Sequence, residues 1–425
     1  MFKNFIIKDH YIYFIYLLPF SFIMGQSALS INFFLIFLSF LLLFIFDNLN
    51  FRKTLDFDSK LITIFFTIII TTQIIYYGID GLKYFSYIRF LALIFLLKYF
   101  FFKNEITFFF KKYFLILISI FIFIFFDLIF QKITGVDFFG YKSTIETNIN
   151  RLTGPFGNNE YIPGSYIFHI CTPAIVYFIY NISHKNLFLR FFIITSITNF
   201  YLLSIFITGE RTSFLLATLS LIILIFIKKN FRKELVFALV TSFLLIFFFS
   251  ANNTYYKDRY LIFKDTVIGK EIDNSKKNNF LDSQWGAHYL TALEIFKKNI
   301  LFGSGARSYR IECHKEEYNK INSRSKDIRC STHPHNFYLE LLAETGIISF
   351  FVFLIYLLNS IVSSFKILFY KKELTIFISF FVIFLSIIWP IRATGSILSN
   401  FAGSMIWLNF AFLSAINFRV SRTNI

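Results

Sequence analysis

The chain has 425 residues, of which 56% are hydrophobic and 22% aromatic, and only 16% carry a charge. Soluble domains average about 25% charged residues, so this composition excludes an ordinary soluble globular fold. The net charge of +17 could indicate nucleic-acid binding. The basic residues instead gather in short segments between apolar stretches, and we expect no nucleic acid among the partners.

Apolar stretches follow one another along most of the chain. A helix that crosses a membrane needs roughly 20 mostly apolar residues, and this criterion predicts an all-α polytopic membrane protein with about 12 transmembrane helices. The predicted spans are residues 11–29, 31–46, 61–77, 84–101, 113–131, 165–182, 188–207, 212–227, 235–251, 336–358, 374–391 and 397–416.

The orientation of these spans follows from the lysines and arginines between them, because such residues are enriched in cytoplasmic loops. With the N-terminus in the cytoplasm, every inside segment is basic, for example "KKNFRKE" and the tail "FRVSR". Both termini are then cytoplasmic, and two long loops, 132–164 and 252–335, lie outside. We therefore predict spans 1–9 in residues 1–251, a large periplasmic loop in 252–335, and spans 10–12 in 336–425.

The large loop contains its own structural signals. "QWGAHYLTALEIFKKN" predicts an amphipathic helix with Trp285, Tyr289, Leu293 and Phe296 on one face. Cys313 and Cys330 can pair in an oxidising compartment, which would stabilise the loop by about 3 kcal/mol. A metal site built from Cys313, His314, Cys330, His333 and His335 is an alternative, but the spacing fits no usual zinc pattern, and we expect no metal.

Two arginines occupy the outer boundaries of predicted spans. Arg211 in "FITGERTSFLL" follows Glu210 and is surrounded by small residues that leave room for a ligand, and Arg392 in "WPIRATGSIL" repeats this arrangement. The alternative is an interfacial anchor that reaches to lipid headgroups. Arg89 in "YIRFLALIF" is interpreted as such an anchor or as an ion-paired residue.

A third basic pair follows a glycine-rich turn. In "ILFGSGARSYR" two glycines predict a tight turn whose backbone N–H groups could face an anion, and Arg307 and Arg310 follow. Guanidinium groups bind phosphate in a bidentate manner. A plain turn is the alternative.

The densest polar cluster, "CSTHPHNFYLELLAETGIISF", stands directly before the tenth span. Pro334 disfavours helix at His333, so His335 or Asn336 lies near the helix N-terminus, where Asn336 can act as a cap. An imidazole near pKa 6.5 can serve as a general base. Glu340 and Glu344 lie one and two turns further on. Burying a carboxylate in an apolar helix costs free energy, and such residues are usually functional or paired. A simple capping turn with a surface histidine is the alternative.

Four segments resemble the O-antigen ligase and polymerase superfamily: "NRLTGPFGNNE", "FITGERTSFLL", "LFGSGARSYRIEC" and "STHPHNFYLELLAETGIISF", in this order. The resemblance implies a mostly helical membrane fold, GT-C-like, in the bacterial inner membrane with its active site on the periplasmic face. It also implies a glycosyltransferase that moves a glycan from undecaprenyl diphosphate to an acceptor, without cofactor or metal.

The resemblance assigns roles to particular residues. His335 matches the catalytic base, Arg211 matches an arginine that holds the diphosphate, and Arg310 is our choice for the second such arginine. Arg307 stands behind Arg310 in this choice. Apart from the resemblance, we also assign substrate binding to His333, Asn336, Arg392 and Arg151, and a structural role to Cys313, Cys330 and Glu344.

Several alternatives remain at this point. The acceptor is lipid A–core for a ligase and a lipid-linked glycan for a polymerase. We favour the ligase, although Ser349 stands where ligases often have a second glycine after Gly346. A transporter or flippase would instead show two related halves and charged helices near the midplane. A purely structural membrane protein would not need outer arginines beside small residues.

Overall fold

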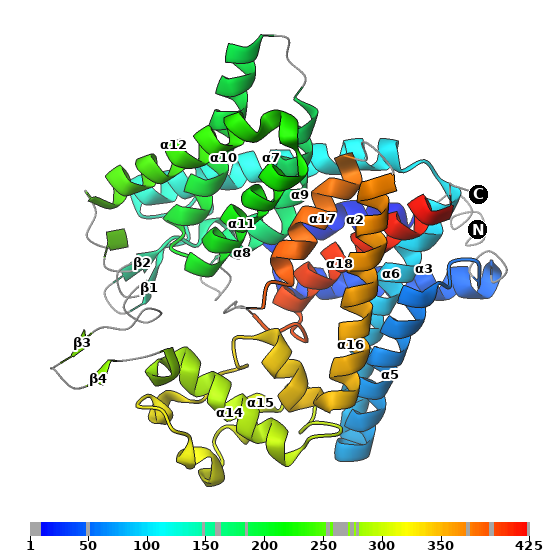
Figure 1. Cartoon of the computed structure of the whole chain (residues 1–425). Coiled ribbons are helices and arrows are strands. Elements are labelled where there is room, and N and C mark those ends of the chain that lie inside the picture. Colours follow the sequence, from blue (N-terminus) through cyan, green and yellow to red (C-terminus); the bar gives the residue numbers. More distant parts are fainter. Residues whose placement is uncertain are drawn as a thin grey trace.

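Helices make up most of the protein in the computed structural model (Figure 1). The structure describes residues 10–47, 52–146, 149–157, 163–182, 186–251, 256–257, 271–272, 276–277, 280–370, 375–390 and 395–422. The α-helices are α2 (Ile12–Ile23), α3 (Gln26–Phe46), α5 (Phe57–Tyr77), α6 (Ile88–Lys103), α7 (Ile106–Thr134), α8 (Pro163–Tyr166), α9 (Thr172–Asn181), α10 (Leu187–Ile207), α11 (Arg211–Ile227), α12 (Arg232–Ala251), α14 (Gln284–Lys298), α15 (Tyr309–Glu312), α16 (Phe337–Tyr370), α17 (Thr375–Ile387) and α18 (Phe401–Arg422).

Shorter elements connect these helices. The 3₁₀-helices are η1 (Gly78–Tyr87), η2 (Gly154–Phe156), η4 (Lys229–Phe231), η5 (Phe280–Asp282), η6 (Glu316–Lys320) and η7 (Lys326–Ile328), and η3 (Ile167–Cys171) is a π-helix. Two small antiparallel hairpins pair β1 (Thr144–Glu146) with β2 (Ile149–Arg151), and β3 (Glu271–Ile272) with β4 (Lys276–Lys277). The prediction of an all-α fold missed these hairpins, which are too short to give an alternating pattern.

The protein is a helical polytopic membrane protein. Every predicted span contains helix in the described residues, and seven segments are long and apolar enough to cross a membrane. These are Gln26–Phe46, Phe57–Lys103, Ile106–Thr134, Leu187–Ile207, Lys229–Ala251, Phe337–Phe369 and Phe401–Arg422. The Phe57–Lys103 segment contains two predicted spans, and α2, α11 and α17 are shorter apolar helices, so the number twelve stays a prediction.

The boundary between the first two predicted spans was wrong. We placed it near residue 30, whereas α2 ends at Ile23 and α3 begins at Gln26. The intervening Gly25 has a φ of 97°, which is readily available only to glycine. The break therefore follows the glycine rather than the apolar pattern, which continues through it.

Helix α18 lies inside the bundle and packs against α6, α16 and α17 (Figure 1). Its Trp407 is fully buried, with ring centroids 4.9 Å from Phe66 and 5.8 Å from Phe90. Aromatic pairs at such distances contribute about 0.5–1.5 kcal/mol each beyond burial. The many phenylalanines thus serve packing in this part of the bundle.

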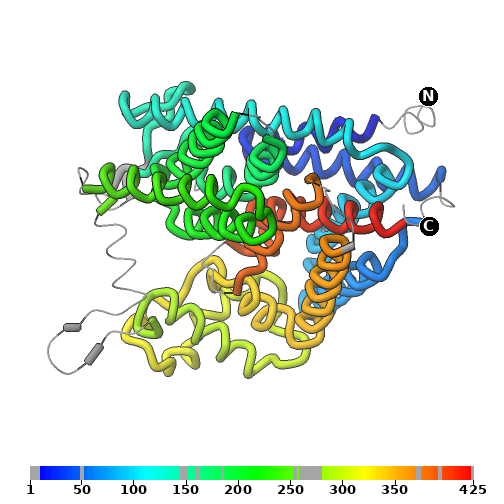
Figure 2. The backbone as a smooth tube through the Cα atoms, turned by 45° about the horizontal axis from the view of Figure 1, so that its top comes forward, coloured from blue at the N-terminus to red at the C-terminus, as the bar shows by residue number. Residues whose placement is uncertain are grey.

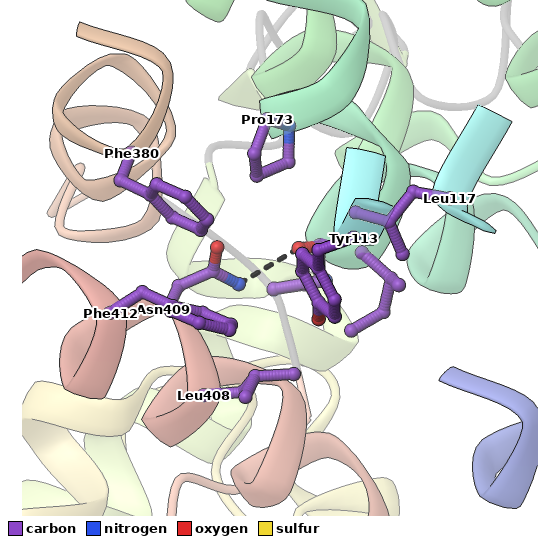
Figure 3. Close-up of a pocket in the computed structure, with 9 residues that line it drawn as sticks. Tyr113, Leu117, Pro173, Phe380, Leu408, Asn409 and Phe412 are labelled. Carbon is purple, nitrogen blue, oxygen red and sulfur yellow. Dashed lines mark hydrogen bonds between the residues drawn. The ribbon is translucent and has the colours of Figure 1, made fainter. Parts of the chain in front are cut away.

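Next to α18, the π-helix η3 marks an irregular place in the bundle. Pro173 cannot donate a backbone hydrogen bond to the preceding turn, and Asn409 of α18 donates its amide to the His169 carbonyl at 2.8 Å (Figure 3). Tyr113 and Phe412 also lie here, and the space between these residues is too small to hold a water molecule. None of the residues predicted to form the active site lines this place.

Residues 280–345 gather at one end of the bundle, which we call the loop face (Figures 1 and 2). A small core there contains Ala292, Ile295, Tyr309 and Ala343, the last of which belongs to α16. A disulfide joins Cys313 and Cys330. The first turns of α16 therefore pack with the large loop, and the helix kinks at Gly346 (φ 74°, ψ 179°) before it continues into the bundle.

Helix α14 was predicted correctly in extent but not in orientation. Its buried residues are Gly286, Ala287, His288, Thr291, Ala292 and Ile295. The predicted face is less buried, and Leu293 is 37% exposed. Helix α14 packs against α16, and Ala292 and Ile295 of α14 share a small core with Ala343 of α16.

Candidate functional site

The segment before α16 forms a strained turn that holds His335. His335 has a φ of 57°, which costs a non-glycine residue about 1–2 kcal/mol. The next residue, Asn336, caps α16, since its Oδ1 accepts hydrogen bonds from the N–H groups of Tyr338 (3.0 Å) and Leu339 (3.3 Å). The cap predicted at Asn336 is confirmed. Its amide also donates to the Pro390 carbonyl at 2.9 Å, so this side chain is engaged within the fold.

The imidazole of His335 lies among other polar side chains. Its Nε2 is 3.1 Å from the Ser331 hydroxyl, and its ring centroid is 4.4 Å from that of His333 and 5.2 Å from that of His288. Burial, followed by the nearby His333 and His288, lowers the pKa of His335 to about 3. The ring is therefore neutral at pH 7, the form in which a nitrogen can accept a proton.

Helix α14 connects His335 with Arg211. Trp285, on its first turn, lies under the Arg211 guanidinium with 5.4 Å between Cζ and the ring centroid. His288 is three residues further along α14 and contacts His335. Residues at this spacing are neighbours on a helix surface. Arg211 and His335 are thus each one side-chain contact away from the same turn of α14.

Arg211 itself is the first residue of α11. The Ser213 hydroxyl donates to Glu210 at 2.5 Å. A Cβ on Gly164 would lie 2.5 Å from the Thr208 hydroxyl and 3.0 Å from Glu210. A glycine is therefore required where α8 passes this turn. The N-terminus of a helix adds positive potential to that of the guanidinium, while the Glu210 carboxylate on the same turn adds negative charge.

The glycine-rich turn does bind a carboxyl group, but that group is the side chain of Glu344. The carboxylate of Glu344 accepts hydrogen bonds from the N–H groups of Arg307 (2.6 Å) and Tyr309 (3.1 Å). The N–H of Gly305 donates to the Glu344 carbonyl at 2.9 Å. The prediction that these N–H groups are free for a ligand was wrong, because a buried carboxylate on α16 needs the same donors.

The side chains of this turn remain available. The Nε atoms of Arg307 and Arg310 are buried and have no hydrogen-bond partner in the described part of the chain. Arg307 has a φ of 60°, and with His335 it is one of two non-glycine residues with positive φ among those described. Both arginines interact electrostatically with Glu340. None of the ion pairs between described residues includes either arginine.

Arg89 joins this group from the bundle. Its Nε is also buried without a partner among the described residues, its guanidinium lies over the Phe90 ring at 4.7 Å, and its charge acts on Arg307. Sequence reasoning took Arg89 for an anchor or a paired residue, because a single arginine in an apolar helix gives no sign of what folds against it.

Glu340 connects α16 to the start of α18. It accepts hydrogen bonds from the Ser396 hydroxyl and from the Ile397 N–H, the latter at 3.1 Å. Arg392 lies in the stretch 391–394, outside the described residues. Arg151 ends strand β2 and is half-buried. None of the contacts described above joins Arg151 to His335.

Possible metal ligands and cavities lie apart from this cluster. Ligand atoms of Cys313, His314 and Cys330 lie within 4.8 Å of one another, but the disulfide engages both sulfurs, and a metal ligand must be a thiolate. A groove of about 320 Å³ is lined by Tyr76 and residues 298–303. Its lining does not include His335 or Arg211.

Comparison with known families identifies the part of the chain that holds these residues. Residues 196–354 match the family model described as O-antigen ligase. This segment, which is less than half of the chain, is similar to the O-antigen ligase family. The resemblance to the O-antigen ligase and polymerase superfamily is thereby confirmed, and the family implies an enzyme of the glycosyltransferase type that acts on lipid-linked glycans. No curated protein matches the chain.

The segment that matches the O-antigen ligase model covers most of the cluster described above. It includes Arg211, all of α14, the glycine-rich turn, His335 and both glutamates of α16. Arg89, Arg151 and Arg392 lie outside it. The residues described above that contact His335 and Arg211 therefore come from the matched segment, with Arg89 contributed by an earlier part of the chain.

Proposed function

We propose that this protein is an inverting glycosyltransferase of the bacterial inner membrane that transfers a glycan from undecaprenyl diphosphate to lipid A–core on the periplasmic face. The observation that carries the proposal is the pair of contacts made by one turn of α14, Trp285 with Arg211 and His288 with His335. These contacts support a base and an arginine acting on one substrate. The O-antigen ligase match supports its chemical class.

In the proposed reaction His335 removes the proton of an acceptor hydroxyl, and the oxygen attacks the anomeric carbon of the donor. The bond from that carbon to the diphosphate oxygen breaks, and undecaprenyl diphosphate leaves with the electron pair. Arg211 and Arg310 hold the diphosphate, with Arg307 beside them, because fixed positive charge is most effective where negative charge develops. This mechanism requires neither metal nor cofactor.

The low pKa of His335 has a consequence for this mechanism. In the empty site the imidazolium is strongly disfavoured by burial. A bound diphosphate would place negative charge nearby and would favour the charged form. His335 would then be a stronger base in the loaded enzyme than in the free one, and proton removal would depend on the donor being present.

A gene deletion followed by gel analysis of lipopolysaccharide tests the proposal. Loss of all long chains together with accumulation of free lipid-linked polymer is expected for a ligase. Core carrying a single repeat would indicate the alternative, a polymerase that extends lipid-linked glycans. An unchanged pattern would remove both functions.

The deletion strain then receives single variants. His335→Ala should lower transfer about 100-fold or more, since general-base catalysis contributes about 10²–10⁴. His314→Ala, which changes an exposed histidine of the same loop, is the matched control and should restore full chains. Full surface glycan with His335→Ala would remove His335 from the mechanism.

A further inference from the structure

His288 is a buried histidine in the cluster that the proposed mechanism leaves without a task. Its residue exposure is 0%, and its Nδ1 lies 2.7 Å from the Arg329 carbonyl oxygen. A carbonyl oxygen can only accept, so Nδ1 carries the hydrogen. Burial lowers the pKa of His288, which keeps the ring neutral and leaves Nε2 without a proton.

That Nε2 is buried and has no hydrogen-bond partner among the described residues. Buried acceptors without a partner are uncommon, and each requires an explanation. The His335 ring is 5.2 Å away between centroids. A purely structural histidine would be fully explained by its bond to Arg329, whereas this one presents an unused acceptor beside the proposed base.

The hydrogen bonding of His335 is compatible with a hydrogen bond to this free Nε2 of His288. The Ser331 hydroxyl lies 3.1 Å from its Nε2, and a hydroxyl can donate to that nitrogen as an acceptor sugar would. In the tautomer in which Ser331 donates, the hydrogen of the neutral ring is on Nδ1. General bases in enzymes are commonly oriented by a third group on their other nitrogen. The rings of His333 and His288 lie beside His335, with centroids 4.4 Å and 5.2 Å from its own.

We infer that His288 is a positioning residue for His335, whose Nδ1–H donates to the bare Nε2 of His288 when substrate is bound. The inference rests on the proposed transfer reaction. The proton of the acceptor hydroxyl moves to His335 Nε2, and no proton moves to His288, which orients the base and stabilises the imidazolium. The two rings are not hydrogen-bonded in this structure, and catalytic hydrogen bonds often tighten only in the substrate complex.

Two substitutions separate this role from a structural one. His288→Asn places an amide nitrogen where Nδ1 is and keeps the bond to Arg329, but it removes Nε2. His288→Gln places an amide near Nε2 and loses the bond to Arg329. The transfer assay uses lipid-linked glycan and lipid A–core extracted from a deletion strain, incubated with each purified full-length variant over a range of pH.

If His288 orients the base, His288→Asn should lower kcat at least about 10-fold with KM unchanged. In the empty site His288 lowers the pKa of His335, but in the substrate complex, which the kcat profile reports, it accepts the hydrogen bond that stabilises the imidazolium. The acidic limb of the kcat profile should therefore move to lower pH in His288→Asn. His288→Gln should retain more activity than His288→Asn. The reverse order of activities, or wild-type kcat and pH profile in His288→Asn, would overturn the inference.

The same assay separates this inference from the proposed function. Transfer by the wild type that is abolished in His335→Ala supports the proposed base, whatever His288 does. A His335→Ala variant that still transfers would refute the proposed base, and the role of His288 would fail with it.

Discussion

Glu344→Gln replaces one of the two carboxyl oxygens that accept hydrogen bonds from the glycine-rich turn. The carboxylate is 1% exposed and accepts from the backbone N–H groups of Arg307 and Tyr309. Glutamine has nearly the same shape but a single acceptor oxygen. Its NH₂ group would face one of the two N–H groups, so that donor would be buried without a partner.

The size of the expected effect follows from the free energy that is lost when that N–H group has no hydrogen-bond partner. A buried polar group left unsatisfied costs about 1–3 kcal/mol, and each 1.4 kcal/mol is a factor of ten in an equilibrium. Local opening of the turn should therefore become about 5- to 150-fold more favourable. The backbone strain at Arg307, which has a φ of 60°, would further favour opening of the turn, because one of the hydrogen bonds that oppose this strain would be lost.

Hydrogen exchange measured by mass spectrometry on the purified protein in detergent reports this opening. Peptides that cover residues 303–311 should exchange faster in Glu344→Gln by the factor above. Glu312→Gln, a change in the same segment at a residue that pairs with exposed Lys315, is the control and should leave protection unchanged. Wild-type protection in Glu344→Gln would refute the idea that this carboxylate holds the turn.

Three further predictions concern the arginines and pH. Arg211→Lys should lose most transfer activity in the deletion strain, because lysine cannot form the two parallel hydrogen bonds of a guanidinium group. Arg324→Lys, on the exposed surface, is the control and should keep its activity. Full activity of Arg211→Lys would indicate that Arg211 is only an interfacial anchor. Arg89→Ala should raise KM for the lipid-linked donor several-fold, since it removes a positive charge that acts on Arg307. An unchanged KM would show that Arg89 takes no part in donor binding. The pKa of His335 is lowered to about 3, so its ring stays neutral from pH 8 to pH 5. The ratio kcat/KM reports the free enzyme and should therefore not decrease as the pH is lowered over this range. A decrease in kcat/KM with a midpoint near pH 6.5 that disappears in His335→Gln would show that the pKa of His335 is not shifted.

Much of the helical architecture could be predicted from the sequence, because apolar content and loop charge act locally. The helix at 284–298 and the cap at Asn336 are further examples, since both depend on a few consecutive residues. The conformation of Gly25 could not be predicted in the same way, because the apolar pattern runs through it without interruption.

The parts that could not be predicted depend on contacts between distant segments. Glu344 takes the N–H groups of a turn 35 residues or more away in sequence, and Arg89 meets Arg307 across more than half the chain. The buried face of α14 was missed because its burial depends on packing against α16, and the hydrophobic pattern of α14 alone does not show which of its faces packs there. His288 gave no signal, as a histidine among apolar residues is most often a satisfied core residue.

The backbone conformations of His335 and Arg307 connect these contacts to function. A turn that served only the fold would be less strained with glycine or asparagine at φ near 60°, yet the chain has a histidine and an arginine there. Each strained residue is secured by a neighbouring carboxylate or amide, Glu344 for Arg307 and Asn336 directly after His335. Strain of this kind persists only when the surroundings over-determine it, and it is concentrated at functional sites. The two side chains are thus presented on the loop face by rigid turns, which is what a reaction that depends on fixed charge and a fixed base requires.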